Sequence, residues 1–311
     1  MQRTIPPTQR ATAILAIWGT VLFWGMSFVS SKTILNTGVP PMTMVAIRFL
    51  IATVVLNLFV RRFDPGARLK KRDILPLAVS GLFGLTIYFF FEARGIRMTS
   101  ASHASLIIAT IPIFTVVAEA IFYRTRISWL AAAGIVLSVA GVVLLVRRAG
   151  EPLLSGSLVG DLLMFGACLS WVVYILLSKN LHTRMSEIAI TAYQSLFGTI
   201  FLLPLAILER GQWVPITLAA GLNLAYLALF CSALSNFLYV YALSRLGPIV
   251  ISPYINLIPV VSVLGGVLIL GESLAWGQAV GGALILAGVL IVNWRQGGGS
   301  KEPTVQSQSR G

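Results

Sequence analysis

The sequence predicts an all-α membrane protein of ten transmembrane helices, arranged as two inverted five-helix repeats with both termini in the cytoplasm. The prediction depends on composition, on an internal repeat and on the distribution of basic residues. Of the 311 residues, 57% are hydrophobic and 11% are charged, whereas a soluble domain has about 25% charged residues. Apolar stretches recur along the chain, and at about 20 residues each they are long enough to cross a ~30 Å hydrocarbon core.

Charge clusters, prolines and glycines set the expected helix boundaries. In chain order the helices are 11–33, 41–60, 74–93, 101–122, 127–146, 158–178, 187–208, 215–241, 248–270 and 274–294. The expected organisation is a cytoplasmic N-terminal segment (1–10), a first repeat (11–146), a connecting loop (147–157), a second repeat (158–294) and a disordered cytoplasmic tail (295–311). The apolar residues are continuous rather than alternating, which favours helices over a transmembrane barrel.

Individual residues justify these elements from the first to the last. Arg3 and Arg10 precede the first apolar run as in a signal peptide, but no small-residue cleavage site follows, so we expect a retained helix. Hydrophilic residues 61–73 separate the second helix from the third. Asp161, near the start of the sixth helix, complements the helix dipole. The Gly-, Ser- and Gln-rich composition of residues 295–311 is typical of disorder.

The basic residues predict the orientation of the chain in the membrane. If the N-terminus is cytoplasmic, 16 of the 23 Lys and Arg lie in cytoplasmic segments, six lie outside, and Arg48 lies within the membrane. Cytoplasmic loops of membrane proteins are enriched in Lys and Arg, so this bias predicts two cytoplasmic termini. The basic loop after the second helix contributes most of it.

Composition also excludes several partners. A net charge of +13 would suggest nucleic acid, but the basic residues lie between apolar spans, so the expected surroundings are the lipid bilayer and no nucleic acid. Cys168 and Cys231 both lie inside apolar segments, which argues against a disulfide or metal framework. We therefore expect no cofactor and no metal. A homodimer is possible.

A shift of 147 residues aligns the chain with itself in two separate regions. Trp24, Ser31 and Lys32 fall on Trp171, Ser178 and Lys179, and Pro112 and Trp129 fall on Pro259 and Trp276. Each repeat holds an odd number of helices, so the second copy must be inverted in the membrane. Inverted repeats are a recurring plan of secondary transporters, with a binding site between the halves. The alternative is a duplication that serves packing alone.

Two of these regions and two further motifs resemble a known family. Trp24-Gly25-Met26-Ser27-Phe28, Arg48-Phe49-Leu50 with Ala52, Pro112-Ile113-Phe114 and Gly271-Glu272-Ser273-Leu274 resemble, in order, the signatures of the EamA family in the drug/metabolite transporter superfamily. The first repeat departs from the pattern because Arg124-Thr125 stands where Gly-Glu is expected.

The resemblance covers residues 11–294 and implies a transporter of ten helices. It also implies a central cavity, peripheral fifth and tenth helices, and export of small metabolites by alternating access, as in the family's YddG-like amino-acid and metabolite exporters.

The candidate substrate-binding residues are mainly aromatic and hydroxyl side chains that share helix faces. Trp24, Ser27 and Ser31 stand at i, i+3 and i+7, and Trp171, Tyr174 and Ser178 repeat this spacing. Such a face suits an apolar solute with a polar head group. The alternative is that the Trp rings anchor at the interface and the Ser residues allow close helix packing. Tyr88 is a further candidate, one turn before Glu92.

Two prolines predict distorted helices beside the binding site. Pro112 and Pro259 each free the carbonyl four residues earlier, at Ile108 and Ile255. Asn256 adds a polar side chain to the ninth helix. These three residues complete the substrate-binding candidates, and the alternative is a kink that serves packing alone.

Intramembrane charges usually mark function or an ion pair. For Arg48 and Glu92 we favour a structural ion pair or gating role over direct substrate binding. Glu119 and His103 are possible proton-linked groups. The alternatives are that Glu119 extends toward Arg124 and Arg126 and that His103 is a satisfied residue at a helix end.

The leading functional hypothesis is a secondary transporter in the cell inner membrane. It exports small metabolites, above all amino acids or related zwitterionic or amphiphilic solutes. A channel-like or structural membrane subunit is the alternative. A membrane-embedded enzyme is less favoured, because no metalloprotease, paired-aspartate or P-loop motif is present.

Overall fold

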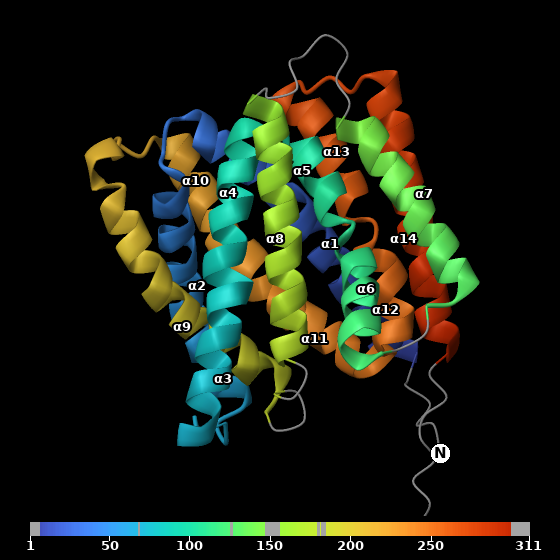
Figure 1. Ribbon diagram of the computed structural model, residues 1–311. Helices are drawn as coiled ribbons and strands as arrows, with labels where there is room; N and C mark the ends of the chain where they lie inside the picture. The colour runs from blue at the N-terminus through green and yellow to red at the C-terminus, as the bar shows by residue number, and fades with distance from the viewer. Residues whose placement is uncertain are drawn as a thin grey trace, which may run out of the picture.

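The computed structural model describes residues 7–67, 69–124, 127–146, 156–178, 181 and 185–299, and these form a helical bundle (Figure 1). The helices of the first half are α1 (Pro7–Asn36), α2 (Pro41–Phe63), α3 (Lys71–Gly81), η1 (Leu82–Ile87), α4 (Tyr88–Met98), α5 (Ala101–Ile108), α6 (Ile111–Tyr123) and α7 (Trp129–Val146). Those of the second half are α8 (Gly156–Ser178), α9 (Glu187–Leu208), η2 (Arg210–Gln212), α10 (Leu218–Tyr226), η3 (Leu227–Leu234), α11 (Ser235–Leu246), α12 (Pro248–Ile255), α13 (Ile258–Leu270) and α14 (Trp276–Gly299).

Within the described residues, eight helical stretches are long and apolar enough to cross a membrane. Two shorter apolar helices, Trp129–Leu145 and Trp276–Val292, occupy the positions of the predicted fifth and tenth helices. The helix ends differ from the expected ones: α1 begins at Pro7 rather than residue 11, and α14 runs to Gly299 rather than 294. Most of the expected loop and the last twelve residues of the expected tail lie outside the described residues.

Equivalent helices of the two halves run in opposite directions. In Figure 1, α1 rises from the end of the bundle here called the lower end, whereas α8 descends from the opposite, upper end. The irregular elements repeat with the same 147-residue shift as the sequence. The π-helical segment η1 corresponds to η3, and the break between α5 and α6 at residues 109–110 corresponds to the break between α12 and α13 at 256–257. The inversion therefore extends to the distortions of the backbone.

The peripheral helices α7 and α14 pack against each other through reciprocal glycines. A methyl group added to Gly141 would lie 2.6 Å from the Gly281 carbonyl oxygen, and one added to Gly281 would lie 2.6 Å from that of Gly141. Gly134 and Gly288 make a second such pair. Since Gly134 and Gly141 are equivalent to Gly281 and Gly288, the contact obeys the twofold relation of the repeats. Small residues let membrane helices approach closely, which explains why this seam requires glycine.

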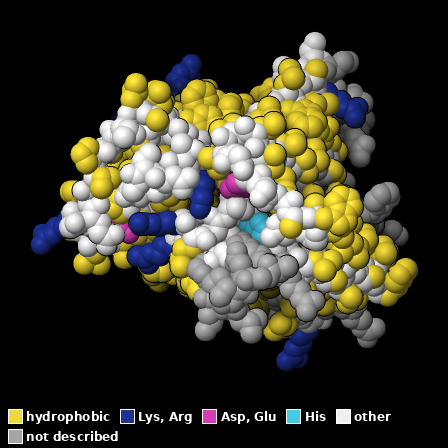
Figure 2. All heavy atoms as spheres, turned by 90° about the horizontal axis from the view of Figure 1, so that it is seen from above, with side chains coloured by type: hydrophobic (Ala, Val, Ile, Leu, Met, Phe, Trp, Pro, Cys, Tyr) yellow, Lys and Arg dark blue, Asp and Glu magenta, His cyan; other side chains and the backbone are white. Residues whose placement is uncertain are grey.

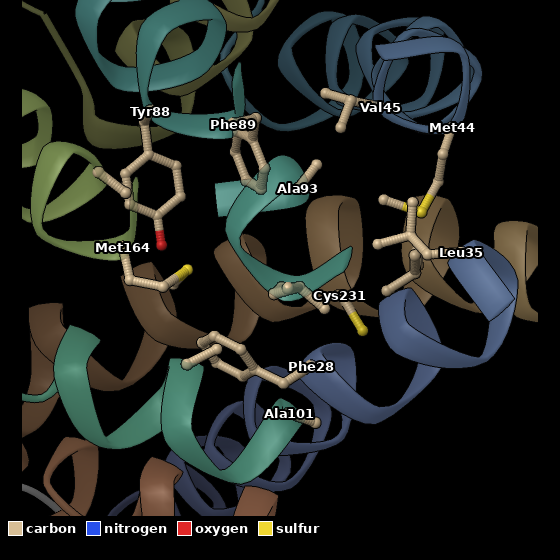
Figure 3. Packing of buried hydrophobic residues seen from close by; sticks show 14 of the residues in the cluster. Phe28, Leu35, Met44, Val45, Tyr88, Phe89, Ala93, Ala101, Met164 and Cys231 are labelled. Atoms are coloured by element: carbon tan, nitrogen blue, oxygen red, sulfur yellow. The ribbon is translucent and has the colours of Figure 1, made fainter. Parts of the chain in front are cut away.

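Apolar packing is denser toward the upper end of the bundle. The largest cluster of buried apolar side chains joins α1, α2, α4, α5 and α8 mainly in the upper half. In Figure 3, Phe28, Met44, Phe89 and Met164 project from these helices into the shared interior. The lower half holds three separate smaller clusters, centred on Leu56, Ile17 and Leu77. The interior is thus continuous above and divided below.

The glycine seam gives a direct stability test. Gly141→Ala and Gly281→Ala should each lower the free energy of unfolding in detergent by about 1–3 kcal/mol, because the added methyl group overlaps the facing backbone. Gly277→Ala, one turn from Gly281 on α14, is the matched control. Nothing lies within 4 Å of its added methyl group, so it should be neutral or slightly stabilising. Equal effects at Gly277 and Gly281 would contradict the proposed close approach.

A central cavity between the two repeats

A cavity of about 310 Å³ lies in the middle of the bundle, between the two halves. This volume is within the range of small-molecule binding sites. Ten of the residues predicted from the sequence line it: Trp24, Ser27, Arg48, Tyr88, Glu92, Pro112, Trp171, Tyr174, Asn256 and Pro259. Each of the eight long apolar stretches of the described chain contributes to its wall, whereas the peripheral pair α7 and α14 does not.

Three predicted residues lie elsewhere. Ser31 is buried on α1, one turn above the cavity wall. His103 is buried near the upper end, where its Nδ1 lies 3.7 Å from Asp161 Oδ2. Glu119 is partly exposed on α6. Sequence position alone could not separate these side chains from the cavity, since that depends on how far the wall extends along each helix.

Aromatic rings from both repeats form a continuous surface around Trp171. The Trp171 ring centroid lies 4.9 Å from that of Tyr88 and 4.7 Å from that of Tyr174. On the opposite side, Trp24 donates its indole N–H to the Cys231 carbonyl at 2.9 Å and packs against Tyr239 at 5.6 Å. The two equivalent tryptophans are thus held differently, one by a backbone hydrogen bond to η3 and one among rings.

The helix breaks bring backbone polarity to the same space. Pro112 and Pro259 stand at the second position of α6 and α13, immediately after each break. Because proline has no N–H, it cannot bond the carbonyl of Ile108 or Ile255, and both of these residues line the cavity. Broken helices are tolerated at membrane depth where they face protein or a watery cavity.

Several polar lining residues were missed by the sequence analysis. Gln194 of α9 donates to Ser80 Oγ at 2.9 Å and Ser178 Oγ at 3.0 Å, and it accepts from the Tyr174 hydroxyl at 3.2 Å. The others are Ser105, Thr191, Ser195, Ser232 and Asn236. A signal was available for Gln194, since a buried amide inside an otherwise apolar membrane helix requires partners.

The direct ion pair expected between Arg48 and Glu92 is wrong. Within the described residues, Arg48 Nε donates to Ser232 Oγ at 2.7 Å, and Glu92 Oε1 accepts from the Tyr88 hydroxyl at 3.1 Å. No ion pair shorter than 4.0 Å joins these two described side chains. Arg48 is bonded to Ser232 and Glu92 to Tyr88 instead of to each other, and the spacing of residues in the sequence does not reveal these partners.

Charged side chains gather over the centre of the upper end (Figure 2). The turn between α4 and α5 is held there by Lys32 and Glu272. Lys32 Nζ donates to the carbonyls of Ile96 at 2.9 Å and Thr99 at 2.6 Å, at the C-terminus of α4. Cations stabilise this end of a helix dipole, as anions stabilise the other.

Glu272 binds the other side of the same turn, at the N-terminus of α5. It accepts from the amides of Ala101 at 2.7 Å and Ser102 at 3.0 Å, and from Ser102 Oγ at 2.6 Å. Lys32 and Glu272, here called the upper latch, join the first and last thirds of the chain across this turn. The sequence pointed to Glu272 only as part of a motif; the structure gives its partners.

A cavity between inverted halves of a membrane-spanning helical bundle defines a membrane transporter. The model of the EamA-like transporter family matches residues 11–147 and again residues 158–294. The chain therefore belongs to the EamA-like transporter family. It is a multi-pass membrane transporter.

Relatives over most of the chain have the same character. An uncharacterized transporter of Archaeoglobus fulgidus is 29% identical over 89% of this chain and 96% of its own length. A probable terminal-alkyne amino-acid exporter of Streptantibioticus cattleyicolor is 28% identical over 92% and 96%. The uncharacterized inner membrane transporter YedA of Escherichia coli is 26% identical over 80% of each chain. A crystal structure that is 22% identical shares the fold, with a TM-score of 0.65 over 92% of this chain and 97% of that one.

The upper latch predicts energetic coupling between residues far apart in the chain. Glu272→Gln and Lys32→Gln should each lower the free energy of unfolding by about 1–2 kcal/mol, through loss of charged helix caps. Because both residues hold one turn, the double variant should lose less than the sum by at least about 0.5 kcal/mol. Arg97→Gln, an exposed cation beside this turn, is the control and should change stability by less than about 0.5 kcal/mol. Strictly additive losses would argue against a shared latch.

Proposed function

We propose that the protein is a secondary transporter that exports small metabolites by alternating access, above all amino acids or related zwitterionic or amphiphilic solutes. In this proposal the chain crosses the membrane ten times, both termini are cytoplasmic, and the lower end, where α1 begins and α14 ends, faces the cytoplasm. The observation that carries the proposal is the cavity itself. It lies where the two broken helices and the two π-helical segments meet, so equivalent elements of both inverted repeats would contact one solute.

The uneven packing supports an inward-facing arrangement. Toward the lower end the cavity wall reaches Thr191, four residues from the start of α9, which is about 6 Å along a helix axis. Toward the upper end, Phe28 and the large apolar cluster lie above the cavity, and the upper latch joins the α4–α5 turn to the rest. A solute would enter from the lower side and leave when the upper half opens.

The chemistry of the wall supports small solutes with apolar and polar parts. Aromatic rings, amides, hydroxyls and two charged groups share a space of about 310 Å³. The printed name of the Streptantibioticus relative, a probable amino-acid exporter, agrees with this class.

Counterflow in proteoliposomes tests the proposal: labelled amino acid should accumulate transiently and saturably in vesicles that were preloaded with unlabelled amino acid. Linear, unsaturable flux would favour a channel-like role instead.

Topology gives a separate test. An impermeant thiol reagent applied to intact cells should label Thr37→Cys in the exposed α1–α2 connection and spare Gly66→Cys in the exposed α2–α3 connection. The native Cys168 and Cys231 are buried, so background labelling should be low. Labelling of Gly66→Cys before permeabilisation would contradict the cytoplasmic placement of the lower end.

The role of the aromatic wall is tested by two tryptophans. Trp171→Ala removes a ring from the cavity and should raise the half-saturation constant for transport roughly tenfold, since one aromatic contact contributes about 1–3 kcal/mol. Trp276→Ala is the control, because this side chain is 83% exposed on the peripheral α14. It should leave the half-saturation constant unchanged. Equal losses at both positions would place the binding site elsewhere.

A further inference from the structure

The cavity follows the twofold relation of the repeats in its backbone but not in its charge. Among its lining residues, Arg48 and Glu92 carry the charges. The equivalent positions in the second repeat hold the uncharged Ser195 and Tyr239. Arg48 and Glu92 lie on α2 and α4 toward the upper end, whereas Trp171 lies on α8 nearer its lower end. The binding space therefore has a charged end and an aromatic end.

Arg48 is held so that its terminal nitrogens are available. Its Nε donates to Ser232 Oγ at 2.7 Å, and its guanidinium carbon lies 5.1 Å and 4.9 Å from the ring centroids of Phe49 and Phe89. Within the described chain this leaves Nη1 and Nη2 without a protein hydrogen bond. A guanidinium held on one edge in this way can bind a carboxylate with its two terminal nitrogens.

Glu92 offers the complementary half. Its Oε1 accepts from the Tyr88 hydroxyl at 3.1 Å, and the side chain is buried at the cavity wall. Its Oε2 has no hydrogen bond to the described residues. A carboxylate oxygen in this position is a natural acceptor for an ammonium group, which has three N–H donors and no acceptor.

The separation of these two charges is the informative feature. A buried ion pair usually closes to direct contact, because an uncompensated charge at membrane depth is costly. Here Ser232 and two phenyl rings hold one group, and Tyr88 holds the other, short of a direct contact within 4.0 Å. A solute with one negative and one positive group would complete both pairs at once.

We propose that Arg48 and Glu92 form a two-point head-group site, in which Arg48 binds the carboxylate of a zwitterionic solute and Glu92 binds its ammonium group. This inference rests on the proposed export function and assigns the residues that select its substrate. The rings of Trp171, Tyr88 and Tyr174 then receive the side chain of the solute. The substrate class is an α-amino acid with an uncharged apolar or aromatic side chain, rather than the corresponding amine or carboxylic acid.

Three compounds with one side chain test the assignment. Phenylalanine has both head groups, phenethylamine lacks the carboxylate, and 3-phenylpropionate lacks the ammonium group. Each is measured as a competitor of labelled phenylalanine counterflow in proteoliposomes. For the wild-type protein, phenylalanine should compete at least roughly tenfold more tightly than either analogue, as expected for loss of one charge-assisted interaction.

The variants should give a crossed pattern. Arg48→Gln should weaken phenylalanine and 3-phenylpropionate roughly tenfold and change phenethylamine by less than about twofold. Glu92→Gln should weaken phenylalanine and phenethylamine and spare 3-phenylpropionate. If Arg48→Gln does not fold, Arg48→Lys retains the charge without the two terminal nitrogens of the guanidinium. Arg48→Lys should then weaken phenylalanine and 3-phenylpropionate by less than Arg48→Gln would, and should again spare phenethylamine.

Arg94 and Glu209 supply matched controls, since this partly buried ion pair of 3.9 Å lies away from the cavity. Arg94→Gln and Glu209→Gln should leave all three competition constants unchanged. Equal weakening of all three compounds by the Arg48 and Glu92 variants would overturn the head-group assignment. So would saturable counterflow by the wild-type protein that is confined to solutes lacking the paired carboxylate and ammonium groups, and this outcome would leave the export function intact. Absence of saturable counterflow across a broad panel of metabolites would overturn the export function itself.

Discussion

The structure depends on one constraint: inside a bilayer, every backbone N–H and C=O group must find a partner within the protein or a watery cavity. Regular helices meet this constraint alone, so departures from them are informative. This chain departs at η1, at η3 and at the breaks before Pro112 and Pro259. All four line or adjoin the same cavity. Side chains of neighbouring helices also bond π-helical carbonyls, as Ser170 bonds Phe83 at 2.7 Å and Trp24 bonds Cys231 at 2.9 Å.

The backbone features of the two repeats have stayed more alike than the side chains that line the cavity. The glycine seam, the π-helical segments and the breaks are all related by one shift of the sequence. Cavity side chains follow that relation only in part, since the Trp pair is retained while Arg48 and Glu92 have uncharged equivalents. Backbone distortions must match for two inverted halves to pack, whereas single side chains at the wall can change without disturbing the bundle. Symmetry therefore describes the frame better than the site.

Much of this architecture could be predicted from the sequence, because membrane helices are defined by length and apolarity, and Pro112 and Pro259 imply distortion wherever they stand. The aromatic faces around Trp24 and Trp171 were found from helical spacing alone. What spacing could not supply was distance between helices. Arg48 and Glu92 lie at similar depth, which suggested a contact, but Ser232 and Tyr88 hold them apart. Gln194 and Glu272 were likewise understood only once their partners on other helices were known.

The upper latch also has a consequence for the balance between conformations. Its carboxylate comes from Glu272, and the equivalent position in the first repeat is Thr125, which cannot supply a charge. Gly271, which precedes Glu272, and Arg124, which precedes Thr125, both have a left-handed backbone conformation. Glycine adopts this conformation without strain, whereas a residue with a side chain such as arginine adopts it at a cost in conformational energy. If the protein alternates access as proposed, its two ends would therefore close with unequal strength, and the two conformations would differ in free energy. A bias of about 1–2 kcal/mol shifts a two-state population roughly five- to thirtyfold, so an empty transporter of this build would rest facing the lower side and leak little in the reverse direction.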